Sequence, residues 1–250
     1  MQRADGFRQF YQTREGRLTA NRLARLIAPT VRRGPAQRFL AMGYPRPLLT
    51  GLRPEVFERA AMLTTEGLPQ EKWPRRGQKN NVAAGRSDAL PFPGAMFDQL
   101  LAIHCLEHGH GDDIVAEWER VLAPAGELIL VVPNRAGTWS SFERTPFGLG
   151  RPYGRGELRT LLEEGGFTVL SWKTALAAPP IRGLFWLEAL LGLLMPGLGG
   201  VHLVLARKGR GPAAMRQGSV VHARRPALAS SPQAAARAML SRHPRCSPPR

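Results

Sequence analysis

Residues 87–134 read SDALPFPGAMFDQLLAIHCLEHGHGDDIVAEWERVLAPAGELILVVPN, and the order of pieces in this stretch decides the fold. An acidic residue and a proline-bounded turn lead into the expected buried strand Phe97–Ile103, which is apolar from Leu100 onward. A segment with helical spacing follows at 112–122, and a second apolar run occupies 128–132. Strands that are apolar throughout are typical of parallel sheets buried on both faces, and a helix between two such strands makes the crossover. The stretch therefore predicts an α/β fold with a mostly parallel sheet.

The rest of the chain extends this alternation. Apolar positions among arginines predict a helical region at 7–28, broken at Gly16. Either Asp112 or Asp113 is expected to cap the helix at 112–122. The last two expected strands have no adequate helix between them, which predicts a late antiparallel pair at the edge of the sheet. The other expected elements are strands at 38–42, 56–65, 167–172 and 201–206 and a helix at 157–164, whereas 66–86 is polar and rich in turn formers.

The net charge of +16 on 250 residues is concentrated at the two ends of the chain. Residues 1–41 carry nine arginines and two acidic residues, residues 207–250 carry ten basic residues and no acidic one, and the part between is near neutral. Basic ends attract nucleic acid, anionic lipid or acidic proteins without specificity. We expect a basic helical extension at 1–34, one domain at 35–208, and a basic, disordered tail at 209–250.

Cysteine usage and the apolar segments bear on the compartment. Cys105 and Cys246 give no disulfide framework, and the N-terminus lacks the apolar core of a secretory signal, so a cytoplasmic location is expected. Residues 184–206 are long enough to cross a bilayer, but Glu188, Pro196 and several glycines interrupt them. We expect a short apolar helix, a turn and a strand there, and no transmembrane span. Peripheral contact of that helix with a membrane is an open alternative.

The acidic residue of the opening stretch stands where open α/β sheets bind ligands. Such sheets hold nucleotide-like ligands beside the carboxyl ends of their strands, and Asp88 lies in the turn that leads to the strand Phe97–Ile103. A carboxylate there can accept a hydrogen bond from the exocyclic amine of an adenine, while Ala89 and Leu90 pack on the ring. The alternative is a solvated aspartate that caps a turn.

A polar cluster follows that strand and contains His104, Cys105, Glu107, His108 and His110. The spacing fits no zinc pattern, so no metal is expected. His104 and His108 are candidates for a general base, because imidazole titrates near neutral pH. The alternative for each is a hydrogen-bonded residue at the end of a strand.

The chain resembles the class I S-adenosylmethionine-dependent methyltransferases, and within them a bacterial branch of the type 11 methyltransferase-domain proteins. The resemblance covers roughly residues 10–208. It rests on acid-Ala-Leu-Pro-Phe at 88–92, Phe-Asp at 97–98, His-x-Leu-Glu-His at 104–108 and Pro-Asn-Arg at 133–135. The resemblance implies a Rossmann-like methyltransferase fold, with a twisted, mostly parallel sheet and helices on both faces, and S-adenosylmethionine as the cofactor.

The resemblance also assigns the cofactor-binding residues. The family has an acidic residue and several glycines after the first strand, where the backbone approaches the amino-acid part of the cofactor. This chain keeps one glycine, Gly43, and has no acid there, so the glycine loop is degenerate. Thr64 and Thr65 stand where the family has an acid for the ribose hydroxyls. The cofactor candidates are Gly43, Tyr44, Glu66, Asp88, Ala89 and His104.

The long loop at 137–156 is aromatic and basic, and its place after a strand end puts it over the substrate side of the expected pocket. Arg144 and Arg151 are candidates to hold an anionic substrate group, and Tyr153 is a third candidate. The alternative is a loop that packs on its own aromatic residues.

The leading hypothesis is an S-adenosylmethionine-dependent methyltransferase that acts on an unidentified small or macromolecular acceptor. One alternative is a non-catalytic, methyltransferase-like interaction or scaffold protein, which the degenerate glycine loop suggests. A second is a nucleic-acid binder that uses the basic termini, with the tail as the contact.

Overall fold

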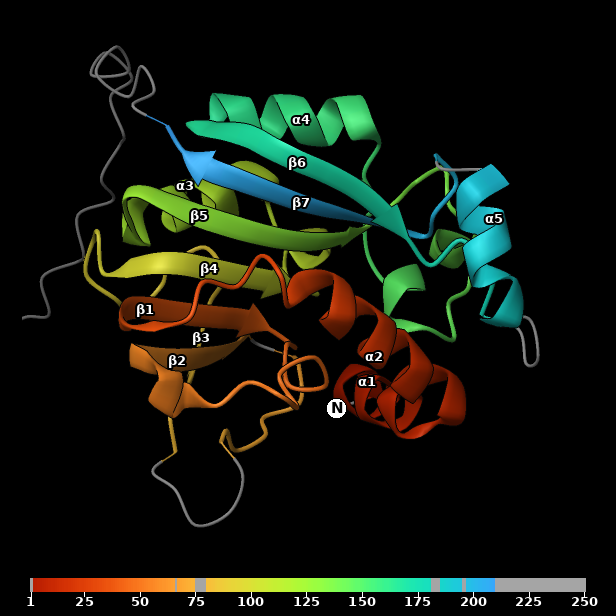
Figure 1. Ribbon diagram of the computed structural model, residues 1–250, viewed down its shortest axis with the longest axis horizontal. Helices are drawn as coiled ribbons and strands as arrows, with labels where there is room; N and C mark the ends of the chain where they lie inside the picture. The colour runs from red at the N-terminus through yellow and green to blue at the C-terminus, as the bar shows by residue number, and fades with distance from the viewer. Residues whose placement is uncertain (1, 66, 75–79, 181–184, 195–196, 210–250) are drawn as a thin grey trace, which may run out of the picture. The chain divides into compact units, whose positions relative to one another are not determined.

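One seven-stranded sheet organises the described part of the chain, which is residues 2–65, 67–74, 80–180, 185–194 and 197–209 of a computed structural model (Figure 1). The strands are β1 (Gly34–Gly43), β2 (Phe57–Thr65), β3 (Val82–Gly85), β4 (Phe97–Ile103), β5 (Leu122–Pro133), β6 (Phe167–Ala175) and β7 (Val201–Lys208). Their order is β3-β2-β1-β4-β5-β7-β6, and the strands from β3 to β5 in this order are parallel. β7 runs antiparallel to both β5 and β6, so the expected antiparallel pair at the edge is confirmed.

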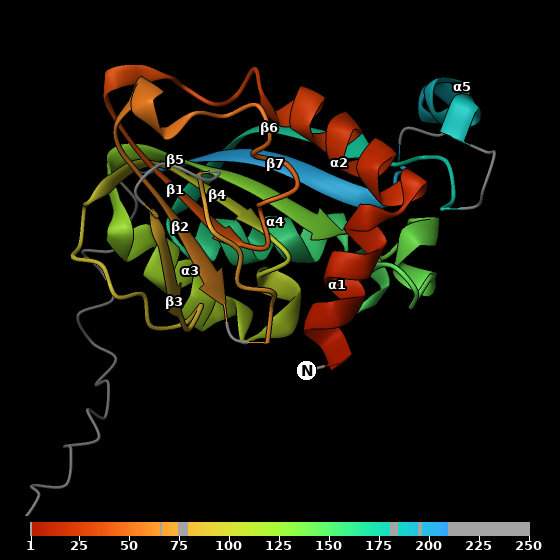
Figure 2. The ribbon, with the colours of Figure 1, turned by 90° about the horizontal axis from the view of Figure 1, so that it is seen from below.

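The central strands bury apolar side chains on both faces of the sheet. Phe39 and Ala41 of β1 lie in one hydrophobic cluster, and Leu40 and Met42, which alternate with them, lie in the other. Helices cover both faces (Figure 2). On the first face these are α1 (Gln2–Gln12) and α2 (Arg14–Ile27), and on the second α3 (Gly111–Val121) and α4 (Arg155–Glu164). Burial on two sides is the reason that the second halves of these strands read as apolar runs.

The N-terminal helical region is two helices, and the expected break at Gly16 is wrong. The chain turns at Thr13, whose Oγ1 accepts a hydrogen bond from the backbone N–H of Gly16 at 2.9 Å and so caps α2. Gly16 has a different role, because a Cβ there would lie 2.0 Å from the carbonyl oxygen of Phe10. The glycine thus allows α1 and α2 to approach closely. Phe7 and Leu23 of these helices have no exposed surface.

Two further expectations are corrected. The polar stretch 66–86 contains the edge strand β3, whose four residues are too few to give a periodic signal. Neither Asp112 nor Asp113 caps α3, because that helix begins at Gly111 after His110, and no side chain caps it. The two aspartates lie in its first turn instead, where their charge is favourable to the helix dipole.

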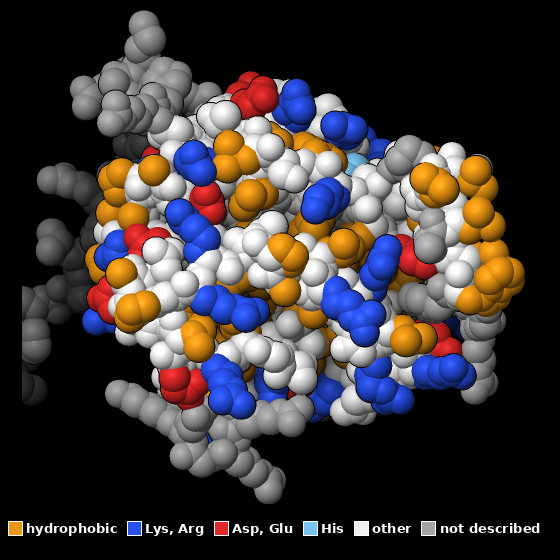
Figure 3. Space-filling model, viewed as in Figure 1, with side chains coloured by type: hydrophobic (Ala, Val, Ile, Leu, Met, Phe, Trp, Pro, Cys, Tyr) orange, Lys and Arg blue, Asp and Glu red, His pale blue; other side chains and the backbone are white. Residues whose placement is uncertain are grey.

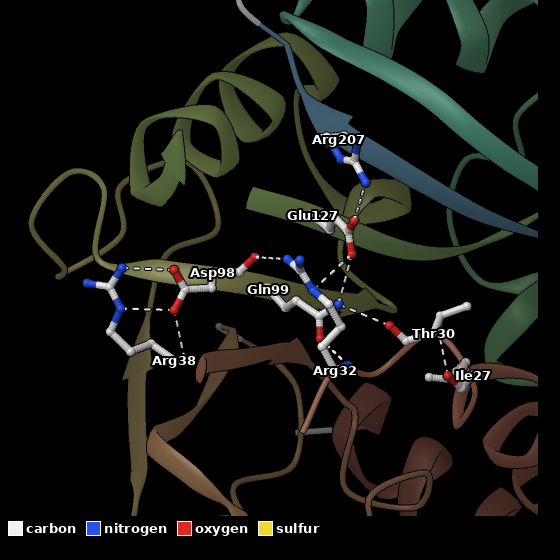
Figure 4. A network of polar contacts seen from close by, with 8 residues as sticks. All are labelled: Ile27, Thr30, Arg32, Arg38, Asp98, Gln99, Glu127 and Arg207. Atoms are coloured by element: carbon white, nitrogen blue, oxygen red, sulfur yellow. Dashed lines mark hydrogen bonds and ion pairs between the residues drawn. The ribbon is translucent and has the colours of Figure 1, made fainter. Parts of the chain in front are cut away.

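A network of ion pairs ties together the amino ends of the central strands (Figure 4). Asp98 at the start of β4 accepts two hydrogen bonds from the Arg38 guanidinium, at 2.9 and 3.0 Å, and one from the Arg38 backbone N–H at 2.9 Å. These bonds hold the pKa of Asp98 below its usual value. Glu127 of β5 pairs with Arg207 at 2.9 Å. The Phe-Asp motif at 97–98 therefore stabilises the sheet at the amino ends of its central strands, opposite their carboxyl ends.

Candidate functional site

The carboxyl ends of β1 and β4 lie level with each other, and β5 continues beyond them to Pro133. In the sheet register Gly43 is paired with Ile103, and Ile103 with Val131. The residues that follow these strand ends therefore meet at one edge, which in open α/β sheets is the edge that binds ligands. Gly43, Tyr44 and His104 are brought together there.

Gly43 makes the sharp turn at the end of β1. Its φ is +88°, and a Cβ would lie 1.9 Å from the carbonyl oxygen of Ile103. The next residue, Tyr44, donates its backbone N–H to that same oxygen at 3.0 Å. The connection from Gly43 to β2 holds turns and the 3-10 turn Pro54–Val56, and no α-helix begins there. The glycine is therefore required by the turn itself.

A buried chain of three side chains spans this edge. The ring of His104 is within hydrogen-bond distance of the Tyr11 hydroxyl at Nε2, 2.7 Å, and of Glu107 Oε1 at Nδ1, 3.1 Å. With the Tyr11 hydroxyl donating to Nε2, the proton of the neutral ring is on Nδ1, which donates to Glu107 Oε1. Burial raises the pKa of Tyr11 well above its usual value, which keeps its hydroxyl protonated as a donor. Both ring nitrogens of His104 are thus engaged within the protein.

Glu107 has a second carboxylate oxygen with no such partner. Its side chain has no exposed surface, and its Oε2 makes no hydrogen bond within the described residues. A buried carboxylate oxygen without a donor is costly. The strand end therefore offers an acceptor that a cationic or hydrogen-bond-donating ligand group can satisfy.

Helix α1 covers the same edge with aromatic side chains. The ring of Phe7 meets the rings of His104, Tyr44 and His108 at centroid distances of 5.0, 5.9 and 6.0 Å. The Tyr44 hydroxyl donates to Glu71 at 2.7 Å, and Arg8 of α1 lies 3.6 Å from the same carboxylate. Burial, together with Glu71, raises the pKa of Tyr44. Helix α1 is thus fixed to the strand ends by both apolar and polar contacts.

Asp88 and Ala89 lie at the neighbouring part of the edge. Asp88 accepts two hydrogen bonds from Arg86, at 2.9 and 2.6 Å, which lower its pKa and keep it ionised. The side chain of Asp88 is 30% exposed and Ala89 is exposed, so the loop presents a carboxylate and an apolar surface to solvent. Ser87 ties the loop to the end of β4 through Cys105, 3.5 Å away.

Two of the three loop candidates contact each other, since the Arg151 guanidinium lies 5.2 Å from the centre of the Tyr153 ring. Arg144 is exposed. The Arg151 side chain pairs with Glu157, while its backbone N–H donates to the carbonyl oxygen of Glu107 at 3.0 Å, which brings this part of the loop to the strand ends. Tyr153 is buried, and its hydroxyl donates to the carbonyl oxygen of Leu106 at 3.3 Å. Glu66 lies outside the described residues.

Sequence reasoning missed Tyr11 as a site residue, and it did not single out Glu107. Glu107 stands three residues after His104 within the His-x-Leu-Glu-His motif, so the motif carried a signal for the pair. Tyr11 is 93 residues away from His104, and only the fold brings the two together.

The methyltransferase resemblance is confirmed by comparison with a family model. A model described as "Methyltransferase domain" matches residues 61–130. This part runs from β2 to β5 and includes Asp88 and His104, whereas Gly43 precedes it. A search of curated proteins finds no match.

Solved structures confirm the fold. An S-adenosylmethionine-dependent methyltransferase from Thermotoga maritima, described as a possible histamine N-methyltransferase, is 15% identical, with a TM-score of 0.57 over 80% of this chain and 93% of that chain. An S-adenosylmethionine-dependent methyltransferase from Archaeoglobus fulgidus is 15% identical, with a TM-score of 0.56 over 80% and 96%. The [4+2]-cyclase SpnF is 20% identical, with a TM-score of 0.53 over 77% and 82%.

The fold is thus the Rossmann-like fold of the S-adenosylmethionine-dependent methyltransferases. The family model that matches this chain is that of the methyltransferase domain. The fold and the family model together imply S-adenosylmethionine as the cofactor. Identities this low establish the fold alone, and one fold supports more than one chemistry. Neither comparison favours the scaffold alternative. In the described residues no helix is long and apolar enough to cross a membrane.

The residues at this edge fit the implied cofactor. Asp88 is ionised and partly exposed beside an exposed alanine, which suits an adenine with its exocyclic amine. The Glu107 oxygen is an acceptor of the kind that a cationic group needs, but the side chain has no exposed surface, because α1 covers this part of the edge.

Proposed function

We propose that this protein transfers a methyl group from S-adenosylmethionine to an acceptor at the carboxyl edge of β1 and β4. The observation that carries the proposal is the matched segment, residues 61–130, whose strands bring the Asp88 loop and the buried His104–Glu107 pair to one edge. When bound, the cofactor supplies a methyl group on a sulfonium, and the S–CH3 bond breaks as an acceptor lone pair forms the new bond.

Asp88 holds the adenine end in this proposal. Its carboxylate is kept ionised by Arg86, so one oxygen can accept the exocyclic amine while the guanidinium pairing persists. Ala89 provides the apolar contact for the ring. Thr65, buried at the end of β2, and Glu66 are the remaining candidates beside the ribose.

The turn Gly43-Tyr44 and Glu107 hold the other end. Gly43 allows the chain to leave β1 at a positive φ, so the backbone can pass close to a ligand at the strand ends. The Glu107 carboxylate is buried beneath α1, so in this proposal α1 moves aside for the ammonium of the cofactor to reach Oε2.

His104 is a positioning residue in this proposal and not a general base. Its two ring nitrogens are taken by Tyr11 and Glu107, so it fixes the direction of the carboxylate. In-line alignment of acceptor and methyl group suffices for many transfers of this kind, and the proton of the acceptor can leave to water. His108, Arg144, Arg151 and Tyr153 remain candidates on the acceptor side.

The test of the proposal is methyl transfer. The protein is incubated with S-adenosylmethionine labelled in its methyl group and with separated small-molecule, protein, nucleic-acid and lipid fractions, and labelled product and S-adenosylhomocysteine are measured. We expect labelling in one fraction, reduced by Asp88→Ala and retained by Asp113→Ala, which removes an exposed carboxylate on α3. Equal labelling by both variants would contradict the assignment of Asp88.

A further inference from the structure

The outer face of α5 (Glu188–Leu194), together with Trp186 of the 3-10 turn Phe185–Leu187 before it, is an exposed apolar surface. Trp186 is 76% exposed, Leu190 50%, Leu193 79% and Leu194 67%. Positions 186, 190 and 193 are four and three residues apart, so in helical geometry they share one face. Large apolar side chains gathered in one place, and not scattered singly, mark a binding surface.

The one charged residue of this segment is turned away from that face. The side chain of Glu188 is buried, and its Oε2 accepts the backbone N–H of Ala178 at 2.7 Å. Ala178 is held in turn by the Trp139 indole, which donates to its carbonyl oxygen at 2.7 Å. The segment is therefore anchored to the domain by its polar residue, and the side that remains outside carries no charge.

Arginines lie on the same side of the molecule. Arg14, Arg17, Arg22 and Arg25 of α2 are exposed, and the residues of that helix that face the core are apolar or small. In both ribbon views α5 and the start of α2 lie at the end of the sheet where β1 and β4 terminate (Figures 1 and 2). In the space-filling view, hydrophobic side chains gather at the end where α5 lies, and Lys and Arg side chains are spread over the adjoining face (Figure 3).

We propose that this surface docks on the interface of an anionic lipid bilayer. Trp186 and the leucines of α5 insert at the level of the headgroups, where tryptophan is favoured, and the α2 arginines contact the phosphates. An apolar segment that stands out from the domain beside a row of cations matches a lipid interface in both shape and charge. Charged side chains are depleted at the centre of protein interfaces, so a protein partner would leave the arginine row unused. The inference does not depend on the proposed methyl transfer.

The test is depth-dependent quenching of tryptophan fluorescence in the full-length protein. The vesicles contain phosphatidylcholine alone or with phosphatidylglycerol, and brominated lipids serve as the quencher. Trp186 is exposed, Trp73, Trp118 and Trp139 are buried, and Trp172 on β6 is half-buried, so the part of the quenching that Trp186→Phe removes reports on Trp186. We expect quenching with anionic vesicles that is lost in Trp186→Phe, although that variant still sediments with the vesicles.

Matched variants separate this surface from the basic tail, which is the same in every protein compared. Leu193→Glu is expected to weaken vesicle binding about tenfold or more, because it places a charge where an apolar side chain would be buried in the bilayer. Leu170→Glu, at a 44% exposed leucine on β6, is its control and is expected to bind normally. Arg14→Gln with Arg17→Gln, at the start of α2, is expected to weaken binding to anionic vesicles, whereas Arg59→Gln with Arg159→Gln is not.

Three results would overturn the inference. The first is no binding to vesicles of either composition. The second is binding that Leu193→Glu leaves unchanged and in which Trp186 is not quenched, since the tail alone would then be the contact. The third is concentration-dependent association of the protein without lipid, abolished by Leu193→Glu, which would make a second copy of this chain the occupant.

Discussion

His202 on β7 is held neutral by its surroundings. Its Nε2 is 3.2 Å from the carbonyl oxygen of Tyr153 and therefore donates, which leaves Nδ1 to accept the Trp172 indole N–H at 3.2 Å. Burial lowers its pKa from 6.5 to about 4. A second proton would break the bond from Trp172, so the neutral ring is part of the packing between β6 and β7.

This burial predicts a loss of stability in mild acid. Between pH 6.5 and about 4 the unfolded chain binds a proton at His202 and the folded chain does not. The free energy of unfolding therefore falls as the pH is lowered through this window, by roughly 3 kcal/mol over the whole range. Urea unfolding at a series of pH values measures it. His202→Gln is expected to flatten the dependence and His110→Gln, at an exposed histidine, to keep it. An equal slope in both variants would contradict the account.

A second residue-scale prediction concerns the buried chain Tyr11–His104–Glu107. Tyr11→Phe leaves His104 Nε2 without its partner in a site closed to water, so we expect a loss of about 1–3 kcal/mol in the free energy of unfolding. Tyr44→Phe is the comparison, because its partner Glu71 is 30% exposed and water can replace the hydroxyl. Chemical denaturation measures both. A loss for Tyr11→Phe no greater than that for Tyr44→Phe would show that the chain adds nothing to stability.

At the scale of elements, the junction of α1 and α2 depends on one glycine. Gly16→Ala is expected to destabilise the protein by about 1–3 kcal/mol, because its Cβ would lie 2.0 Å from a backbone oxygen of α1 that cannot move freely. Gly6→Ala, within α1, meets nothing within 4 Å and is expected to stabilise by about 0.5–1 kcal/mol through helix propensity. Thermal unfolding compares the two. Stabilisation by both would contradict the close approach of the helices.

The elements that sequence reasoning located well are those with a strong local pattern. The strand Phe97–Ile103 was predicted with its observed bounds, since its residues from Leu100 are apolar on both faces and a turn precedes it. β3 was missed because a four-residue edge strand of small residues has no period to read. The early start of β1 at Gly34 and of β5 at Leu122 was missed for a related reason: their first residues are partly polar or proline-containing and are held by the neighbouring strands.

The candidate site residues divide in the same way, into those that a local sequence motif indicates and those that only the fold brings together. Asp88, His104 and Gly43 were predicted from local motifs, and the strand register brings Gly43 and His104 to one edge. Tyr11 and Phe7 were not, because the packing of α1 on the strand ends is a contact across about ninety residues of chain. Asp98 belongs to the same motif as Asp88, yet its role in the Arg38 pair at the opposite end is a property of the sheet.

At the scale of the whole molecule, one edge of the sheet gathers the features that bear on function. The strand ends with Gly43 and His104, the helix α1 that covers them and the Asp88 loop lie together there. The opposite end holds the ion-pair network around Asp98, which stabilises the sheet (Figure 4). The ion pairs around Asp98 are distant from the proposed binding edge, so variants of Asp98 or Arg38 are expected to leave cofactor binding intact.

The measurement that tests the central claim most directly is calorimetric titration of S-adenosylmethionine and S-adenosylhomocysteine into the full-length protein, with Asp88→Ala and Asp113→Ala beside the wild type. The account predicts saturable binding to the wild type and to Asp113→Ala, with a loss of about tenfold or more in Asp88→Ala when a charge-assisted hydrogen bond is removed. Circular dichroism confirms that each protein is folded. A folded wild type that binds neither compound, or equal affinity in Asp88→Ala, would contradict it.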